Sequence, residues 1–230
     1  MNDIYIYHHL GLGDHIILNG FVRSYLDQYD RIFLFSKPGN SKNVKRMYKD
    51  ISDKLKVISL DDKGVREFMN MFRSHKYLIV GHTGDFFRRI DDPNSEKTFD
   101  QLFYEDHQIP FDDKWNKFHL ERDTEREKEV YYDILGLKDD SEFIFLHESN
   151  ERPINQEIPS NIKIIRPDNM SVGIFDYLFT IEKAKQVHVM NSSFMNLIDC
   201  IQLREDGLFY HEYSRPNINA TLKLPWIILK

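Results

Sequence analysis

The stretch that decides the fold is "DIYIYHHLGLGDHIILNGFVRSYL", residues 3–26. It begins with a short β-prone run, and the apolar residues after its glycines recur at helical spacing. This order predicts a strand, a glycine turn and a helix. A turn that contains Gly11 and Gly13 lets the backbone approach a ligand closely, and it points the free N–H groups of the helix toward that ligand.

The same alternation continues through the first half of the chain. Strands that alternate with helices over short connections form a parallel sheet that is covered on both faces. Ligands of such sheets bind at the carboxyl ends of the strands. The predicted strands lie near residues 3–8, 31–35, 55–59 and 76–81, and the predicted helices near 14–27, 41–50 and 63–74.

The middle of the chain has a different character, and the alternation then restarts. Residues 98–107 and 123–136 predict helices, and the aromatic loop "IPFDDKWNKF" lies between them. We therefore expect an α/β protein of two lobes, residues 1–120 and 121–230, that face each other across a cleft. The later predicted elements are strands at 142–147, 162–167 and 186–190, helices at 172–184 and 192–203, and β-prone segments at 208–213 and 224–229.

The composition excludes some classes of function. The chain has 31 basic and 37 acidic residues, and the net charge of -6 argues against sequence-independent nucleic-acid binding, which needs a basic face. No apolar run approaches the roughly 18 residues that span a bilayer, and the first residues lack a basic leader region. We expect a cytoplasmic protein without a transmembrane segment. The only cysteine, Cys200, leaves no disulfide framework.

Asp14 is the residue of the glycine turn that carries chemistry. The turn is not a dinucleotide fingerprint, because Ile16 stands where G-x-G-x-x-G needs glycine, and it is not a Walker A loop. Asp14 lies in the first turn of the predicted helix. There it either caps the helix, which is worth about 1 kcal/mol, or contacts a ligand. His15 either moves protons beside it or packs as a half-buried helix residue.

The segment "HLGLGDHIILNGFVR" resembles the opening of glycosyltransferases of the GT-B architecture, in particular the heptosyltransferase family. The segment "TFDQLFYEDHQIPFDDKWNKF" and the following "ERD" resemble uncharacterised glycosyltransferase-like proteins of bacterial and viral surface-glycan clusters. The resemblance implies a compact GT-B-like fold of two Rossmann-like lobes. It also implies transfer of a sugar from a nucleotide-diphosphate donor to a glycan hydroxyl, with Asp14 as the base. The first lobe then lies on the acceptor side, and the second binds the nucleotide sugar.

Three segments of the second half are candidates for donor binding. "FIFLHESNERP" ends a strand at His147 and Glu148 and then supplies Arg152, a cation that a diphosphate leaving group needs. Fucosyltransferase-like enzymes, which the segment resembles, carry a basic residue after the equivalent strand. The alternative is a solvated polar loop. The segment "RPDN", from Arg166 to Asn169, ends the next strand and is a candidate for the edge of the nucleobase or ribose.

The third segment, "HVMNSSFMNLID", runs from a strand directly into a helix. Asn191, Ser192 and Ser193 place hydroxyls and free N–H groups at the helix start, which makes an anion site. Ordinary N-capping by one serine is the alternative. The segment is similar to the "SNSSFSWWAA" motif of fucosyltransferases and to the Asp-x-Gly turn of heptosyltransferases. Asn191 replaces the aspartate of that turn, and Asn196 occupies the place of the family's histidine.

The segment "GHTGDFFRRIDD" follows the fourth predicted strand and is a candidate for acceptor binding. Arg88 and Arg89, with Phe86 and Phe87, either hold an acidic or phosphorylated acceptor or form a packed loop with solvated arginines. The chain has no Asp-x-Asp, the metal-diphosphate element of the other main glycosyltransferase architecture. We therefore expect no metal and no cofactor, with the nucleotide sugar as substrate.

Two other classes of function stay open from the sequence. One is a non-catalytic nucleotide- or glycan-binding module, and the other is a different small-molecule enzyme, such as a methyltransferase, that uses the glycine turn. The chain is shorter than typical GT-B enzymes and ends in the strand-like "LKLPWIILK". We therefore expect a minimal version of the architecture, with a homodimer as one way to complete it.

Overall fold

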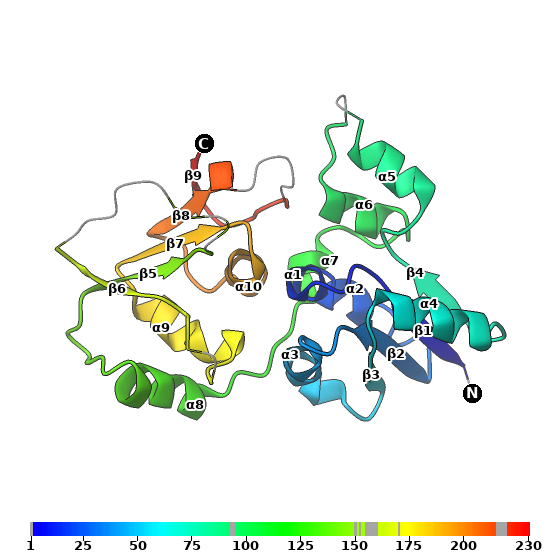
Figure 1. The fold of residues 1–230 in the computed structure, drawn as a ribbon, viewed down its shortest axis with the longest axis horizontal. Helices are drawn as coiled ribbons and strands as arrows, with labels where there is room; N and C mark the ends of the chain where they lie inside the picture. Colours follow the sequence, from blue (N-terminus) through cyan, green and yellow to red (C-terminus); the bar gives the residue numbers. More distant parts are fainter. Residues whose placement is uncertain are drawn as a thin grey trace. The chain divides into compact units, whose positions relative to one another are not determined.

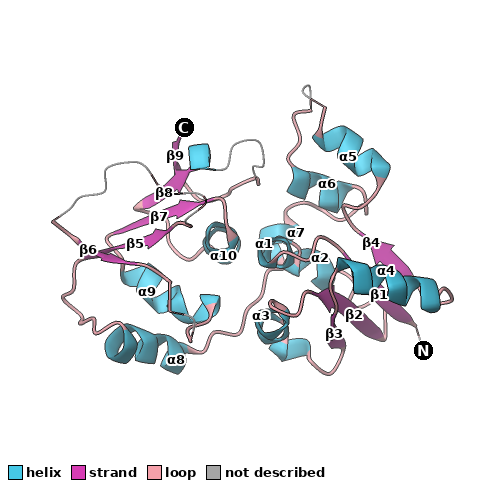
Figure 2. Cartoon of the chain, viewed as in Figure 1, coloured by secondary structure: helices cyan, strands magenta, loops and turns pink. Residues whose placement is uncertain are grey.

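The computed structural model describes residues 2–92, 95–149, 151, 153–154, 161–169, 171–214 and 220–230. The chain divides into two compact units, Met1–Glu121 and Arg122–Lys230. Each unit is built on one parallel sheet flanked by helices (Figures 1 and 2). No helix in the described ranges is long and apolar enough to cross a membrane.

The sheet of the first unit has the strand order β3-β2-β1-β4, and all its pairs are parallel. The predicted strands of this half are confirmed, although the last is shorter than expected. The two central strands, β1 and β2, are mostly buried, as is typical of a parallel sheet that is covered on both faces. The strands are β1 (Asp3–Tyr7), β2 (Arg31–Ser36), β3 (Leu55–Ser59) and β4 (Tyr77–Ile79).

The helix predicted over residues 14–27 is two short helices, α1 (Leu12–Ile17) and α2 (Asn19–Arg23). The hydroxyl of Tyr104 causes the break, because it donates to the carbonyl of Ile17 at 2.8 Å and accepts from the N–H of Phe21 at 3.2 Å. It therefore bridges a pair of backbone groups that an unbroken helix would join directly.

The segment after β4, for which a packed loop was one of two alternatives, is the helix α5 (Gly84–Ile90). Thr83 begins this helix, because its Oγ1 accepts a hydrogen bond from the N–H of Phe86 at 3.1 Å. The other helical elements of this unit are α3 (Ser41–Met47), η1 (Lys49–Ile51), α4 (Asp62–Met71), α6 (Phe99–Glu105) and α7 (Asp113–Asn116).

The order of the strands places a switch point between β1 and β4. The chain moves outward from β1 to β3 and then returns past β1 to β4. Because such crossovers are right-handed, α4 covers the face opposite to α1 and α3. Val65 of α4 accordingly packs with Tyr5, Tyr7 and Phe35. The turn that carries Gly11 therefore starts beside β4, where sheets of this kind bind ligands.

The sheet of the second unit has the strand order β6-β5-β7-β8-β9, again with parallel pairs throughout. Its switch point lies between β5 and β7, because the chain moves from β5 to β6 and returns past β5 to β7. The predicted strands of this half are confirmed. They are β5 (Phe143–His147), β6 (Lys163–Ile165), β7 (Gln186–Met190), β8 (Leu208–His211) and β9 (Ile227–Leu229).

The helix α10 (Ser193–Ile201) follows β7 directly and holds the last segment of the chain in place. Asp199 of this helix accepts from the backbone N–H groups of Lys223 and Leu224 and from Nε1 of Trp226, at 2.9 to 3.1 Å. The other helical elements are α8 (Thr124–Glu129), η2 (Val130–Ile134), η3 (Ile174–Tyr177), α9 (Leu178–Lys183) and η4 (Glu212–Ser214).

Candidate functional site

The glycine turn places the carboxylate of Asp14 over the start of α1. Gly11 precedes the helix with extended backbone angles (φ -69°, ψ 147°), and Gly13 lies in its first turn. A Cβ atom added at Gly11 would lie 2.5 Å from Oδ2 of Asp14. A side chain at position 11 would therefore displace this carboxylate from the position that it has here. Asp14 is the third residue of α1 and is partly exposed, so its position suits both a helix cap and contact with a ligand.

His15, the second predicted catalytic residue, is fully buried. Its ring meets that of His8 edge to face, with centroids 4.3 Å apart. Neither ring nitrogen has a hydrogen-bond partner among the described residues. Burial lowers the pKa of His15 well below its usual value, and His8 lowers it further. These facts favour the packing alternative for His15.

Three aromatic side chains form a column at the switch point of the first unit. His82 stacks on Tyr7 with centroids 4.3 Å apart, and His9 stacks on His82 at 4.6 Å. We call Tyr7, His82 and His9 the ring column. Nε2 of His9 donates to the carbonyl of Gly81 at 2.7 Å. Gly81 has a φ of +74°, and a side chain there would also collide with Phe103.

Arg88 and Arg89, which the sequence suggests for binding the acceptor substrate, lie on α5 and form ion pairs with nearby carboxylates. Arg88 pairs with Asp85. Arg89 pairs with Asp106 and, at 3.3 Å, with Glu105. Both arginines line a cavity of about 520 Å³ together with Asp91 and Asp92.

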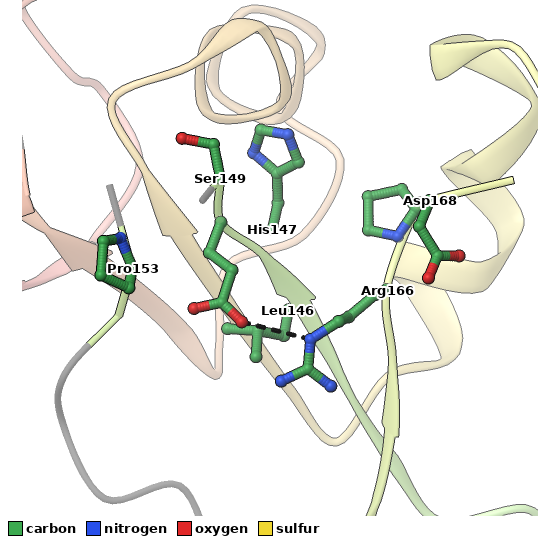
Figure 3. Close-up of a pocket in the computed structure, with 8 residues that line it drawn as sticks. Leu146, His147, Ser149, Pro153, Arg166 and Asp168 are labelled. Carbon is green, nitrogen blue, oxygen red and sulfur yellow. Dashed lines mark hydrogen bonds and ion pairs between the residues drawn. The ribbon is translucent and has the colours of Figure 1, made fainter. Parts of the chain in front are cut away.

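In the second unit, a pocket of about 500 Å³ opens at the carboxyl ends of β5 and β6. Figure 3 shows His147 and Ser149 on the β5 side and Arg166 and Asp168 on the β6 side. The structure thus brings together three predicted donor residues, His147, Glu148 and Arg166. The residues that line it are Leu146, His147, Glu148, Ser149, Pro153, Arg166, Pro167 and Asp168.

Glu148 accepts hydrogen bonds from Arg166 and Ile154 beside this pocket. One carboxylate oxygen accepts from Nε of Arg166 at 3.2 Å, and the other accepts from the N–H of Ile154 at 2.9 Å. Glu148 therefore holds the side chain of Arg166 toward β5. The sequence gives no sign of this ion pair, because its two partners are 18 positions apart.

His147 is a neutral side chain at the same edge. Burial lowers the pKa of His147 to about 4, against an opposing effect of the Glu148 charge. Its ring contacts that of Phe194 in α10, with centroids 4.7 Å apart. Nδ1 of His147 is buried and has no hydrogen-bond partner in the described part of the chain.

The start of α10 lies next to this pocket, because β5 and β7 are neighbouring strands and His147 pairs with Val189. Ser192 occupies the N-cap position, yet its side chain makes no capping hydrogen bond. Oγ of Ser192 and, one turn later, Oδ1 of Asn196 are buried without a hydrogen-bond partner among the described residues. Asn191 is buried, and Ser193 is the first residue of the helix. Simple capping by Ser192 does not account for this geometry.

Three further observations complete the site. Arg152 lies outside the described residues. Within the described ranges, no group of three or more histidine, cysteine, aspartate or glutamate residues is arranged to hold a metal ion. The pocket also contains Asp168, which belongs to the segment 166–169 that the sequence suggests for the edge of the nucleoside. Asp168 follows β6 by three residues, and a carboxylate just after a strand was the signal available for it.

The second unit also contains a chain of polar side chains that the sequence analysis missed. Nδ1 of His188 and Nε2 of His211 are 3.0 Å apart, and Nδ1 of His211 is 3.0 Å from the hydroxyl of Tyr213. Gln186 contacts the other nitrogen of His188 at 3.2 Å. Burial lowers the pKa of both histidines to about 4. Polar residues inside otherwise apolar strands were the only signal for this chain.

A structural comparison identifies a protein with a similar fold. The crystal structure of the glycosyl transferase family 9 protein from Veillonella parvula DSM 2008 matches 99% of this chain and 85% of its own, with a TM-score of 0.59 and 12% sequence identity. The expected α/β fold class of GT-B type is thereby confirmed, and at this identity the likeness concerns the fold alone. Protein-family models give no match, and curated protein sequences give none.

Proposed function

We propose that this chain is a glycosyltransferase that moves a sugar from a nucleotide-diphosphate donor to a hydroxyl of a glycan. The start of α10 is the observation that carries this proposal. Buried polar atoms normally have partners, and here Oγ of Ser192, which can donate a hydrogen bond, has none among the described residues. A bound diphosphate would give the hydroxyl of Ser192 and the first N–H groups of the helix an acceptor.

The remaining donor residues have roles that follow from their positions. Ser193 and Asn191 flank Ser192 at the helix start and would contact the same phosphates. His147, neutral at pH 7, and Arg166 lie on the two sides of the adjacent pocket, which would take the nucleoside. Arg152 keeps the role that the sequence predicts for it, which is to offset the charge of the departing diphosphate.

Asp14 is the proposed base of the reaction. A sugar hydroxyl is a poor nucleophile, so a carboxylate within hydrogen-bond reach takes its proton as the oxygen attacks the anomeric carbon. The bond from that carbon to the diphosphate breaks as the glycosidic bond forms, and the proton moves to Asp14. Gly11 leaves the room that this carboxylate needs. The resemblance of the glycine turn to heptosyltransferases supports this role.

The fold supports the proposal, since the chain shares it with a glycosyl transferase family 9 structure. Because the sequence has no Asp-x-Asp, we propose a reaction that does not depend on a metal ion. A chelator should then leave the rate unchanged. Strict dependence on Mg²⁺ would contradict this part of the proposal.

The test is incubation with a panel of nucleotide sugars, with free nucleoside diphosphate as the readout. Release from one donor, and its increase on addition of glycans, is the expected result. A thermal shift with a nucleotide sugar but without release would instead indicate a non-catalytic binding module. A response to S-adenosylmethionine alone would indicate a methyltransferase, and would refute the proposal.

A further inference from the structure

The carboxyl edge of the first unit has an exposed aromatic surface. His9, at the end of the ring column, contacts Phe86, Phe87 and Phe103, with centroid distances of 5.9, 6.3 and 5.6 Å. Phe86 and Phe103 are buried, whereas 46% of Phe87 is exposed. Phe87 is therefore the side of this cluster that a ligand can reach.

The rings beneath Phe87 are held in place by hydrogen bonds. The hydroxyl of Tyr7 donates to Asp62 at 3.1 Å. Nε2 of His9 donates to the carbonyl of Gly81 at 2.7 Å, and the ring of His82 is stacked between those of Tyr7 and His9. A surface that is ordered before binding loses little conformational entropy when a ligand arrives.

The charges around Phe87 favour an uncharged ligand. The sequence suggested an acidic acceptor because Arg88 and Arg89 follow Phe87. Arg88 pairs with Asp85, and Arg89 is surrounded by Asp106, Glu105 and Asp85. An anion at Arg89 would have to compete with three carboxylates and would be repelled by any of them that it displaced, whereas the exposed Arg88–Asp85 pair contributes little either way.

The position of the surface connects it with the proposed reaction. His9 and Asp14 both lie in the segment that joins β1 to the first turn of α1. The helix α5, which carries Phe87, begins just after β4, on the other side of the switch point. We propose that Phe87 and His9 hold an uncharged sugar ring of the acceptor, packed with its C–H face on the aromatic surface. This inference rests on the proposed glycosyltransferase function, and it replaces the acidic acceptor suggested by Arg88 and Arg89.

The test uses protein labelled with ¹³C-phenylalanine and titrated with maltotriose, cellotriose, chitotriose and glucose 1-phosphate. At least one neutral trisaccharide should shift the ring signals of Phe87 in a saturable way. Phe87→Ala should weaken that binding by about 3- to 10-fold, the effect of one aromatic contact, and Phe87→Trp should retain it. Phe72→Ala is the matched control, because Phe72 is a phenylalanine of the same unit with a similar exposed fraction, 40%.

Two results would overturn the inference. One is that no neutral trisaccharide shifts the Phe87 signals, and the other is that only glucose 1-phosphate binds and that Arg88→Ala abolishes its binding. The nucleotide-sugar assay on the same sample separates this failure from that of the proposed function. Nucleoside diphosphate release without trisaccharide binding would refute the inference alone. Trisaccharide binding at Phe87 without release from any donor would instead refute the enzymatic function.

Discussion

Replacing Gly11 by alanine tests the role of Asp14 without changing any ionisable group. The new Cβ atom would lie 2.5 Å from Oδ2 of Asp14, and ordinary contact begins at 3.4 Å, so the carboxylate must move by about 0.9 Å. The backbone at Gly11 is extended and suits alanine. Misplacing a catalytic group by about 1 Å can cost roughly 10²-fold in rate, so we expect a loss of that size in sugar transfer.

The stability of the Gly11→Ala variant should change little. Displacing Asp14 from the helix start costs up to about 1 kcal/mol, and the stiffer unfolded chain of an alanine variant returns about 0.4–1 kcal/mol. Urea unfolding should therefore give a free energy of unfolding within about 1 kcal/mol of the wild type. Gly39→Ala is the matched control, because a Cβ atom there meets nothing within 4 Å. It should change neither the rate nor the stability.

The variant Asp14→Ala completes the test, because it removes the oxygen with which the new methyl group collides. In that background, Gly11→Ala should cause no further loss of transfer rate. A folded Gly11→Ala protein that transfers sugar at the wild-type rate would show that the position of the carboxylate does not matter for catalysis. Asp14 would then be a helix cap.

Three further predictions follow from single sites. Asp14→Asn keeps a capping oxygen but not a base, so transfer should fall by roughly 10²- to 10⁴-fold while urea unfolding changes by less than about 1 kcal/mol; near wild-type transfer would refute the base. Burial lowers the pKa of His8 to about 3, whereas the pKa of an unfolded histidine is about 6.5. As the pH falls below 6.5, His8 therefore binds a proton in the unfolded chain but not in the folded one. The free energy of unfolding should fall by about 2 kcal/mol from pH 7.5 to pH 5 because of His8. Urea unfolding of His8→Phe should lack that part of the decline, and an identical pH dependence would contradict it. Lys114→Met leaves Asp100 charged and fully buried without its 2.8 Å ion pair, so denaturation should show a loss of about 3–5 kcal/mol, and a loss below about 1 kcal/mol would disprove the structural role.

The elements that could be predicted from the sequence are those with local causes. The strands of both sheets are runs of β-branched and aromatic residues, and the predicted segments overlap the observed strands. The order of strands and helices also implied parallel sheets. Long-range contacts explain the failures. The interruption between α1 and α2 depends on Tyr104, which lies more than 80 positions from the groups that it bridges.

The candidate site was predictable in its positions but not in its interactions. Residues at the carboxyl ends of strands, such as His147 and Asn191, could be selected because parallel sheets bind ligands there. The burial of His15 could not be predicted, because an amphipathic pattern does not tell which polar residues of a helix are covered by neighbouring side chains. The ion pairs of Glu148 with Arg166 and of Arg89 with Glu105 likewise depend on contacts between separate elements, which the sequence does not show.

The central claim, that a nucleoside diphosphate binds at the start of α10, can be tested directly by NMR. The measurement is a titration of ¹⁵N-labelled protein with UDP, GDP, ADP and dTDP, in which the backbone amide signals are followed. The account predicts that at least one of them shifts the signals of Ser192, Ser193 and His147 with a single saturable affinity. If none of the four shifts these signals, or if they shift only residues elsewhere in the chain, the claim is contradicted.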